Sequence, residues 1–229
     1  MILGNGLIAN AFKNEHLPSD ALIFASGVSN SKETDLTQFR RELDLLNQTI
    51  QENKERRLVY FSTASVLDQE MASEPYVIHK LQCEELIRKS CERHLIVRVT
   101  NVVGNSGNPH TVFKFFTDHI RNETSFELWT RACRNLVDID DVARIVVALL
   151  LAGGIAAQTF LLANPTNHAV TELVKLLENK LNKKALYTEV NKGSCVAYEM
   201  PESVAFYQTK GFSFPEDYLE KLIDRYITL

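Results

Sequence analysis

The stretch that decides the fold is MILGNGLIA, residues 1–9, in which a short apolar run passes through a glycine turn into a helical pattern. Glycines permit a tight turn and let the backbone approach a pyrophosphate, which is attracted by the free N–H groups and positive dipole end of the following helix. The pattern is therefore interpreted as a dinucleotide contact, and the alternative is a plain turn between a strand and a helix. The G-x-G-x-x-A turn consists of Gly4, Asn5, Gly6, Leu7, Ile8 and Ala9.

Short apolar runs alternate with helical patterns along the rest of the chain, which indicates βα units and a parallel sheet. We expect a single Rossmann-like α/β domain over residues 1–229, with helices on both faces of the sheet and a reduced number of strands. The expected strands are residues 1–3, 22–25, 58–61, 95–99 and 159–162; the expected helices are 7–14, 36–53, 76–91, 111–121, 141–151, 171–181 and 216–227.

Composition excludes several classes of protein. A net charge of −4 gives no reason to expect binding to nucleic acid or to an anionic membrane. The longest apolar run, residues 145–157, is shorter than the ~20 residues of a membrane span, and the glycine turn at Gly4 leaves no room for a signal peptide. We therefore expect a reduced, cytoplasmic protein without a metal or a disulfide framework, because the four cysteines lie far apart and form no C-x-x-C pair: Cys83, Cys91, Cys133 and Cys195.

A tyrosine and a lysine stand four residues apart, as Tyr76 and Lys80, in a predicted helix. Residues at this spacing share one helix face, so the ammonium can lie beside the phenol and lower its pKa, as a general acid/base working near neutral pH requires. The alternative is an amphipathic helix with an exposed lysine. His79 lies between the two residues, and we expect it to point off their face toward solvent.

Hydroxyl side chains follow the predicted strand 58–61 as Ser62, Thr63 and Ser65. The carboxyl ends of parallel strands are where open α/β sheets bind ligands. A hydroxyl at this edge could donate a hydrogen bond to a substrate carbonyl beside the tyrosine. The alternative is that these residues only start the next loop.

Taken together, these segments resemble the extended short-chain dehydrogenase/reductase family of sugar-nucleotide epimerases, dehydratases and reductases, as do residues 98–104 and 134–142. The resemblance implies a NAD or NADP cofactor, acid/base catalysis by Tyr76, and polarisation of the substrate by Thr63. It assigns Lys80 to lowering the pKa of Tyr76 and holding the cofactor ribose. The residues that it implies for cofactor binding are Gly4, Asn5, Gly6, Leu7, Ile8, Ala25, Ser26, Gly27, Ser62 and Lys80.

The resemblance also implies a substrate, a nucleotide-activated sugar of the kind used in surface-polysaccharide synthesis. Ser65, Asn101 and Arg134 are the residues it implies for binding that substrate, and a planar guanidinium suits a diphosphate. The alternatives are a loop asparagine and a surface arginine. The smaller, substrate-binding part is expected around residues 101–135 and 165–229. Because the family often dimerises through the helices at 36–53 and 76–91, a homodimer is also implied.

The chain departs from the family in its first third. The glycine turn and the strand that ends at Phe61 are separated by about half the residues usual in the family. One interpretation is that the strand before Ala25 is the second strand, with Ser26 in place of the ribose-binding acid, which suits NADP. The alternative, which we prefer, is that this strand is the family's fourth strand and that the adenosine-binding strands are deleted. The sequence thus indicates a NAD(P)-dependent oxidoreductase or epimerase; the alternative is a member that binds a nucleotide, sugar-nucleotide or protein partner without turnover.

Overall fold

The computed structural model describes residues 1–105, 111–153 and 157–228. The chain divides into two compact units, each of which has a hydrophobic core of its own. Unit 1 comprises Met1–Thr100 and Ile139–Leu162, and unit 2 comprises Asn101–Asp138 and Ala163–Leu229. Part of the predicted substrate-binding region, residues 106–110, lies outside the described residues, as do residues 154–156 of the apolar run and the C-terminal residue 229.

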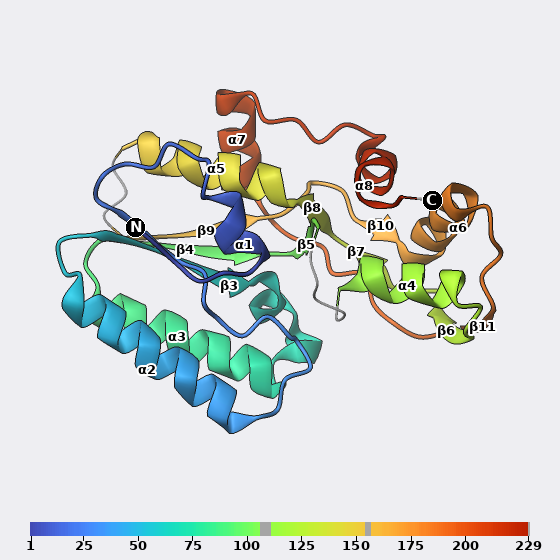
Figure 1. The fold of residues 1–229 in the computed structure, drawn as a ribbon, viewed down its shortest axis with the longest axis horizontal. Coiled ribbons are helices and arrows are strands. Elements are labelled where there is room, and N and C mark those ends of the chain that lie inside the picture. The colour runs from blue at the N-terminus through green and yellow to red at the C-terminus, as the bar shows by residue number, and fades with distance from the viewer. Residues whose placement is uncertain (106–110, 154–156, 229) are drawn as a thin grey trace. The chain divides into compact units, whose positions relative to one another are not determined.

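Unit 1 is built on a parallel sheet with the strand order β1-β2-β3-β4-β9 (Figure 1). Each strand coincides with one of the apolar runs, so the predicted sheet is confirmed. The strands are β1 (Ile2–Leu3), β2 (Ala21–Phe24), β3 (Arg57–Thr63), β4 (His94–Val99) and β9 (Ala157–Leu162).

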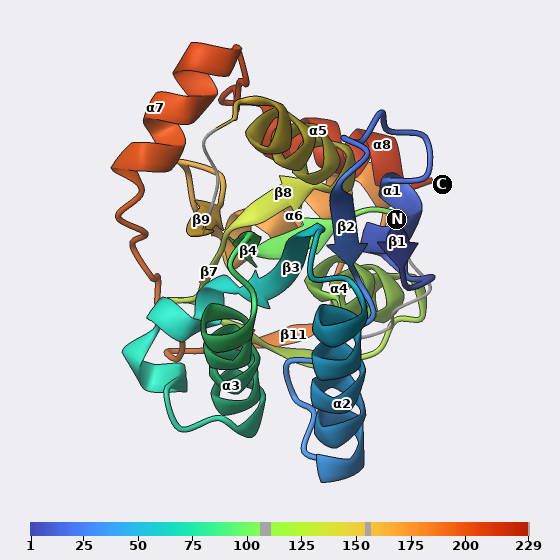
Figure 2. The same cartoon turned by 90° about the vertical axis from the view of Figure 1, so that its left-hand side faces the viewer.

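Helices cover both faces of this sheet, as the sequence predicts (Figure 2). On one face, Phe24 and Tyr60 pack in a core cluster with side chains of the two long helices. Successive residues of a strand point to opposite faces, and Phe61 accordingly meets the ring of Phe12, at the end of α1, at 5.8 Å on the other face. The first face carries α2 (Leu36–Glu52) and α3 (Pro75–Ser90), and the second carries α1 (Leu7–Ala11) and α5 (Ile139–Leu151).

The connection from β1 to β2 has the opposite hand from its neighbours. The crossovers through α1 and α2 step in the same direction along the sheet, but the two helices lie on opposite faces. Crossovers are almost always right-handed, and the one through α2 agrees with the one through α3, so the crossover through α1 is left-handed. The same connection would be right-handed if α1 led to a strand on the far side of β1. No strand of the described residues lies there, which agrees with the interpretation that the adenosine-binding strands are deleted.

Unit 2 has a core between helices and a small sheet. Helices α4 (Val112–Arg121), α6 (Val170–Leu181) and α8 (Tyr218–Tyr226) pack around it with the parallel strands β6 (Phe126–Trp129) and β11 (Tyr187–Val190). The sequence does not predict these strands or the remaining elements of the unit. These are β5 (Asn101–Val103), paired with β8 (Leu136–Asp138), β7 (Cys133–Arg134), paired with β10 (His168–Ala169), and α7 (Pro201–Lys210).

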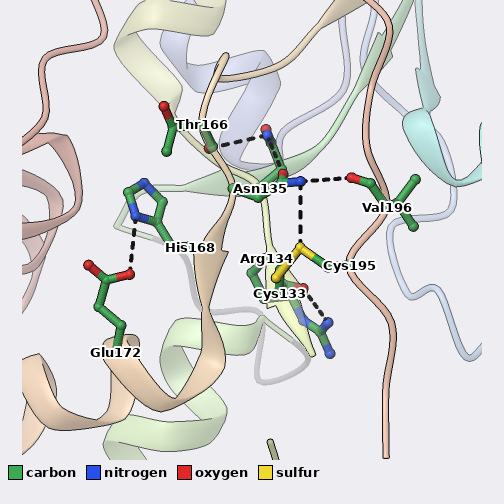
Figure 3. Close-up of a disulfide and its surroundings, with 9 residues drawn as sticks. Cys133, Arg134, Asn135, Thr166, His168, Glu172, Cys195 and Val196 are labelled. Atoms are coloured by element: carbon green, nitrogen blue, oxygen red, sulfur yellow. Dashed lines mark hydrogen bonds and ion pairs between the residues drawn. A yellow bond between two sulfur atoms is a disulfide. The ribbon is translucent and has the colours of Figure 1, made fainter. Parts of the chain in front are cut away.

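A disulfide joins Cys133 in β7 to Cys195, in the segment that follows β11 (Figure 3). The expectation that all four cysteines are reduced is therefore wrong. The two residues are 62 positions apart in sequence, a separation with no recognisable spacing, and they meet because residues 194–195 run beside β7, where the Cys133 N–H donates to Ser194 O at 3.2 Å. Cys83 and Cys91 are free thiols.

Among the described residues, no helix has both the length and the apolar character needed to cross a membrane. The most apolar one, α5, has 13 residues and carries two acidic residues in its first turn.

Candidate functional site

The structure brings Thr63, Tyr76 and Lys80 together in unit 1. Thr63 is the last residue of β3, and Tyr76 lies in the first turn of α3, directly after Pro75, whose fixed φ suits the start of a helix. Lys80 follows one turn later, with its Nζ atom 5.7 Å from the centre of the Tyr76 ring. All three side chains are buried, with exposed fractions of 9%, 8% and 2% respectively.

The ammonium of Lys80 is held by another side chain, Glu42 of α2. Its Nζ atom lies 2.9 Å from Glu42 Oε1 and donates a second hydrogen bond to the Tyr60 hydroxyl at 3.2 Å. Glu42 is fully buried. The alternative expectation, an exposed lysine on an amphipathic helix, is therefore wrong: the lysine faces the helix pair and the sheet.

Glu42 accepts hydrogen bonds from three further donors on three different segments. The Val28 N–H donates at 2.6 Å, the Tyr60 hydroxyl at 2.7 Å, and the His79 Nε2 atom lies at 2.8 Å. His79 is 1% exposed and stacks on Phe39 with 4.5 Å between ring centres, so the expectation that it faces solvent is wrong. The helical spacing of Phe39 and Glu42 places both on the buried face of α2, which is the sequence signal that could have revealed this carboxylate.

Charges in this cluster oppose each other at the tyrosine. Burial alone would raise the pKa of Glu42, but the Lys80 ammonium and the hydrogen bonds from His79, Lys80 and Tyr60 hold it well below its usual range. Burial raises the pKa of Tyr76; the Lys80 charge and the Thr63 hydroxyl lower it, while the Glu42 charge raises it again. The net shift of the Tyr76 pKa is upward, so the expected lowering by Lys80 is outweighed.

A possible metal set also occurs here, because Glu42, His79 and Cys83 place potential ligand atoms within 4.8 Å of one another. The Lys80 ammonium already balances the charge of Glu42, and it would repel a cation at that position. The cluster is therefore accounted for by its ion pair, and the absence of a metal stays a prediction.

The two glycines of the first turn have different environments. Gly4 has φ +123°, and a Cβ atom there would lie 2.2 Å from Ala25 O, so the close approach of the turn to the end of β2 requires glycine. At Gly6, with φ −78°, a Cβ atom would meet nothing within 4 Å. Nothing in the described chain requires glycine at Gly6, which leaves the backbone there open to a ligand such as a phosphate. The helix that follows has only five residues, so its dipole adds little.

The other residues predicted to contact a cofactor lie around these two features. Ala25, Ser26 and Gly27 follow β2, and a Cβ atom at Gly27 would lie 2.6 Å from Glu42 Oε1 and 2.9 Å from Lys80 Nζ. Gly27 thus makes room for the ion pair. The Ser62 hydroxyl is buried and donates to Glu84 at 2.7 Å.

Residues of unit 1 fit one half of a dinucleotide. The open backbone at Gly6 suits a pyrophosphate, and the buried Tyr76, in the first turn of α3, suits a nicotinamide. The adenosine half finds no matching wall, because none of the described strands lies beyond β1. The fit is therefore to the nicotinamide half.

In unit 2 the structure brings Asn101 and Arg134 near each other through a residue that the sequence analysis missed, Asn135. The Asn101 side chain donates to Asn135 O at 3.0 Å. Arg134 Nη1 donates to Cys133 O at 2.7 Å (Figure 3). The buried Asn135 side chain donates to Asn164 O at 2.8 Å and accepts from Asn164 N at 2.9 Å. Neither a charge nor a spacing pattern singles out Asn135 in the sequence. Its role is to hold the backbone at Asn164 in place through these hydrogen bonds. Ser65 lies in unit 1, where its N–H donates to Thr63 Oγ1 at 3.1 Å.

The first strand of the parallel sheet leads into a glycine turn, and a tyrosine and a lysine lie one turn apart on a helix that packs on the sheet. This combination is typical of Rossmann-like, nucleotide-binding proteins. Residues 8–161 match the NAD dependent epimerase/dehydratase family, and the chain belongs to this family. The resemblance found in the sequence is thereby confirmed. The family binds NAD(H) or NADP(H). No curated protein matches the sequence.

Solved structures share the fold at low sequence identity. The enzyme WbmH from Bordetella bronchiseptica, in complex with NAD+, is 18% identical with a TM-score of 0.69, over 90% of this chain and 74% of its own. UDP-glucuronic acid 4-epimerase from Bacillus cereus, with UDP-glucuronic acid and NAD, is 16% identical with a TM-score of 0.71, over 89% and 76%. RMD from Pseudomonas aeruginosa, with NADPH, is 19% identical with a TM-score of 0.68, over 96% and 85%.

Proposed function

We propose that this protein is a NAD(P)-dependent enzyme that reduces, oxidises or epimerises a nucleotide-activated sugar. The observation that carries the proposal is the assembly of Thr63, Tyr76 and Lys80 in one buried site at the end of β3. The family match and the nucleotide-sugar and dinucleotide complexes of the structural neighbours support it.

In this proposal, a nicotinamide held by the cofactor-binding residues would supply the hydride that is exchanged with the sugar carbon. Tyr76 exchanges a proton with the sugar oxygen, and Thr63 donates a hydrogen bond to the same oxygen. The backbone at Gly4, Gly6 and Gly27 lines the cofactor site, together with Asn5, Leu7, Ile8, Ala25 and Ser26. Ser65, Asn101 and Arg134 bind the nucleotide-sugar, with the guanidinium of Arg134 on the diphosphate.

A second function, binding of a nucleotide or sugar-nucleotide without turnover, is favoured by one specific observation. Glu42 lies 2.9 Å from Lys80 and offsets part of the positive charge that would favour phenolate at Tyr76. The adenosine half of the site also has no described strand beyond β1 to enclose it.

The test that separates the two functions is turnover by the Tyr76→Phe variant. We expect NADPH oxidation with UDP- or dTDP-linked keto sugars to fall by about 10²–10⁴-fold, with NADPH binding and folding retained. Tyr187→Phe is a matched control, since this partly exposed tyrosine lies in β11 of unit 2. Undiminished turnover in Tyr76→Phe would remove Tyr76 from the mechanism, and wild-type binding without any turnover would favour the second function.

A cytoplasmic location, a place in surface-polysaccharide synthesis and a homodimer through α2 and α3 belong to the same proposal. Two exposed apolar side chains on α3, Ile78 and Leu81, support the dimer. The disulfide between Cys133 and Cys195 weighs against a reducing compartment. Sedimentation of the purified protein tests the dimer directly.

A further inference from the structure

The ammonium that should serve Tyr76 lies closer to a carboxylate than to the phenol ring. Lys80 Nζ is 2.9 Å from Glu42 Oε1 but 5.7 Å from the centre of the Tyr76 ring. Four titratable groups surround Lys80 and Tyr76: a carboxylate from α2, a phenol from β3, and an imidazole and a thiol from α3. They belong to Glu42, Tyr60, His79 and Cys83. Glu42 therefore offsets part of the lysine charge at Tyr76, because the Lys80 charge lowers the pKa of Tyr76 and the Glu42 charge raises it.

The arrangement is built into the fold rather than made by one flexible side chain. Glu42 is fully buried and receives hydrogen bonds from a backbone N–H, a phenol, an imidazole and the ammonium. Any side chain at Gly27 would overlap both members of the ion pair, at 2.6 Å and 2.9 Å. A buried carboxylate with this many donors stays ionised and stays in place.

We propose that Glu42 is a positioning residue that keeps Tyr76 a proton-donating phenol, so that the site at neutral pH works in the direction of carbonyl reduction, with a keto-sugar nucleotide as substrate. This inference rests on the proposed function and adds its direction. Oxidation of a sugar alcohol, which also begins an epimerisation, needs a base at this position, whereas reduction of a ketone needs an acid. The upward shift of the Tyr76 pKa agrees with the acid role.

The step balances with the groups on hand and a reduced nicotinamide. A hydride delivered from the nicotinamide forms the new C–H bond, and the π electron pair of the carbonyl moves to its oxygen. That oxygen takes the proton of the Tyr76 hydroxyl, which leaves Tyr76 as a phenolate and the nicotinamide oxidised. Lys80 stabilises the phenolate for the short time before a proton from solvent restores it.

A first experiment needs no ligand. The near-ultraviolet tyrosinate absorbance of the full-length wild type is titrated with pH and compared with that of Tyr76→Phe. The difference between the two curves is the ionisation of Tyr76, which we expect only above the ordinary tyrosine pKa of ~10. Ionisation of Tyr76 near neutral pH would overturn the proposal.

A second experiment removes the Glu42 charge. In Glu42→Gln, the coupled Tyr76–Lys80 pair should lose its first proton at a pH about one unit or more below that of the wild type. The reason is that the negative charge of Glu42, which disfavours loss of a proton, is absent from the variant. Glu84→Gln is the matched control: Glu84 is also fully buried, but it is paired with Arg88 and Arg98. An unchanged titration in Glu42→Gln, or an equal shift in both variants, would refute the role of Glu42. If Glu42→Gln does not fold, the wild-type titration decides.

The direction itself is tested by turnover at neutral pH with NADPH plus UDP- or dTDP-linked keto sugars, and with NADP+ plus the corresponding alcohols. We expect turnover with the keto sugars to exceed that with the alcohols at least tenfold. A preference for the alcohols would overturn the inferred direction while supporting the proposed enzyme. No turnover with either set would contradict the proposed function, whereas the titration of Tyr76 would still report on Glu42.

Discussion

The two candidate regions of this protein are held in place by different interactions. Around Tyr76 in unit 1, a buried ion pair between Glu42 and Lys80 fixes the side chains. Around Arg134 in unit 2, a disulfide and the amide hydrogen bonds of Asn135 fasten short strands and loops. A buried ion pair responds to pH and tolerates reductants, whereas a disulfide responds to reductants. Conditions that disturb one region should therefore leave the other intact.

The largest expected effect is on the stability of unit 2. Removing the disulfide by Cys133→Ser opens a loop with a sequence separation of 62 residues and should lower the free energy of unfolding by about 4 kcal/mol. The single tryptophan, Trp129, lies in β6 of unit 2, so its fluorescence during urea unfolding follows this unit. Cys91→Ser is the control, because Cys91 is a free thiol of unit 1. Equal stability of Cys133→Ser and wild type would mean that the disulfide does not hold unit 2.

The next effect concerns ligand binding by unit 2. Arg134→Ala should weaken the binding of UDP by about 2–3 kcal/mol, the loss of a charged hydrogen-bonded pair. Titration calorimetry measures it. The control is Arg131→Ala, since Arg131 is exposed and its guanidinium donates to Asn191 O at 3.3 Å. A dissociation constant for UDP that is the same in Arg134→Ala and wild type would return Arg134 to a structural role.

A pair of glycine variants sharpens the account of unit 1. Gly27→Ala places a Cβ atom against Glu42 and Lys80 and should cost about 1–3 kcal/mol of stability. Gly6→Ala has open space around its Cβ atom, so it should leave stability unchanged and weaken NADPH binding. Thermal unfolding and NADPH fluorescence measure the two effects. The opposite pattern, with Gly6→Ala unstable and Gly27→Ala tolerated, would contradict the environments described for both glycines.

The smallest expected effect is the response of unit 1 to acid. The pKa of Glu42 is held well below its unfolded value, so its ionisation contributes stability that is present above the unfolded pKa of ~4.3 and is lost as the pH falls further. This loss is measured as the decrease in the protection of the β3 amides against hydrogen exchange when the pH is lowered from about 6 to about 3. The slope with pH should be shallower in Glu42→Gln. Identical slopes in the variant and wild type would mean that other groups dominate.

Much of unit 1 could be predicted from sequence because its signals are local. Apolar runs form the strands, and helical periodicity places α2 and α3 within a residue of their observed bounds. Unit 2 was harder, since β5, β7, β8 and β10 have only two or three residues each and form through long-range pairing. The start of α6 shows the same limit: the helix is expected from residue 171, but it begins at Val170, after Ala169, without a side-chain cap.

The candidate site divides in the same way. The spacing of Tyr76 and Lys80 on one helix is visible in the sequence, so their proximity was predictable. The contact between Lys80 and Glu42 joins residues 38 positions apart and depends on the packing of α2 against α3. The burial of His79 follows from the same packing. The pairing of Cys133 with Cys195 is long-range as well. The sequence therefore identified Tyr76 but not the charged side chains that pack around it.

The most direct measurement is a titration of the purified full-length protein with NADH and with NADPH, followed by nicotinamide fluorescence. The account predicts binding in the micromolar range, because the open backbone at Gly6 and the buried site around Tyr76 suit the nicotinamide half of a dinucleotide. Gly6→Ala should weaken that binding without unfolding the protein. No binding of either dinucleotide up to millimolar concentration would contradict the account, because the glycine turn would then be structural and Tyr76 would have no hydride partner.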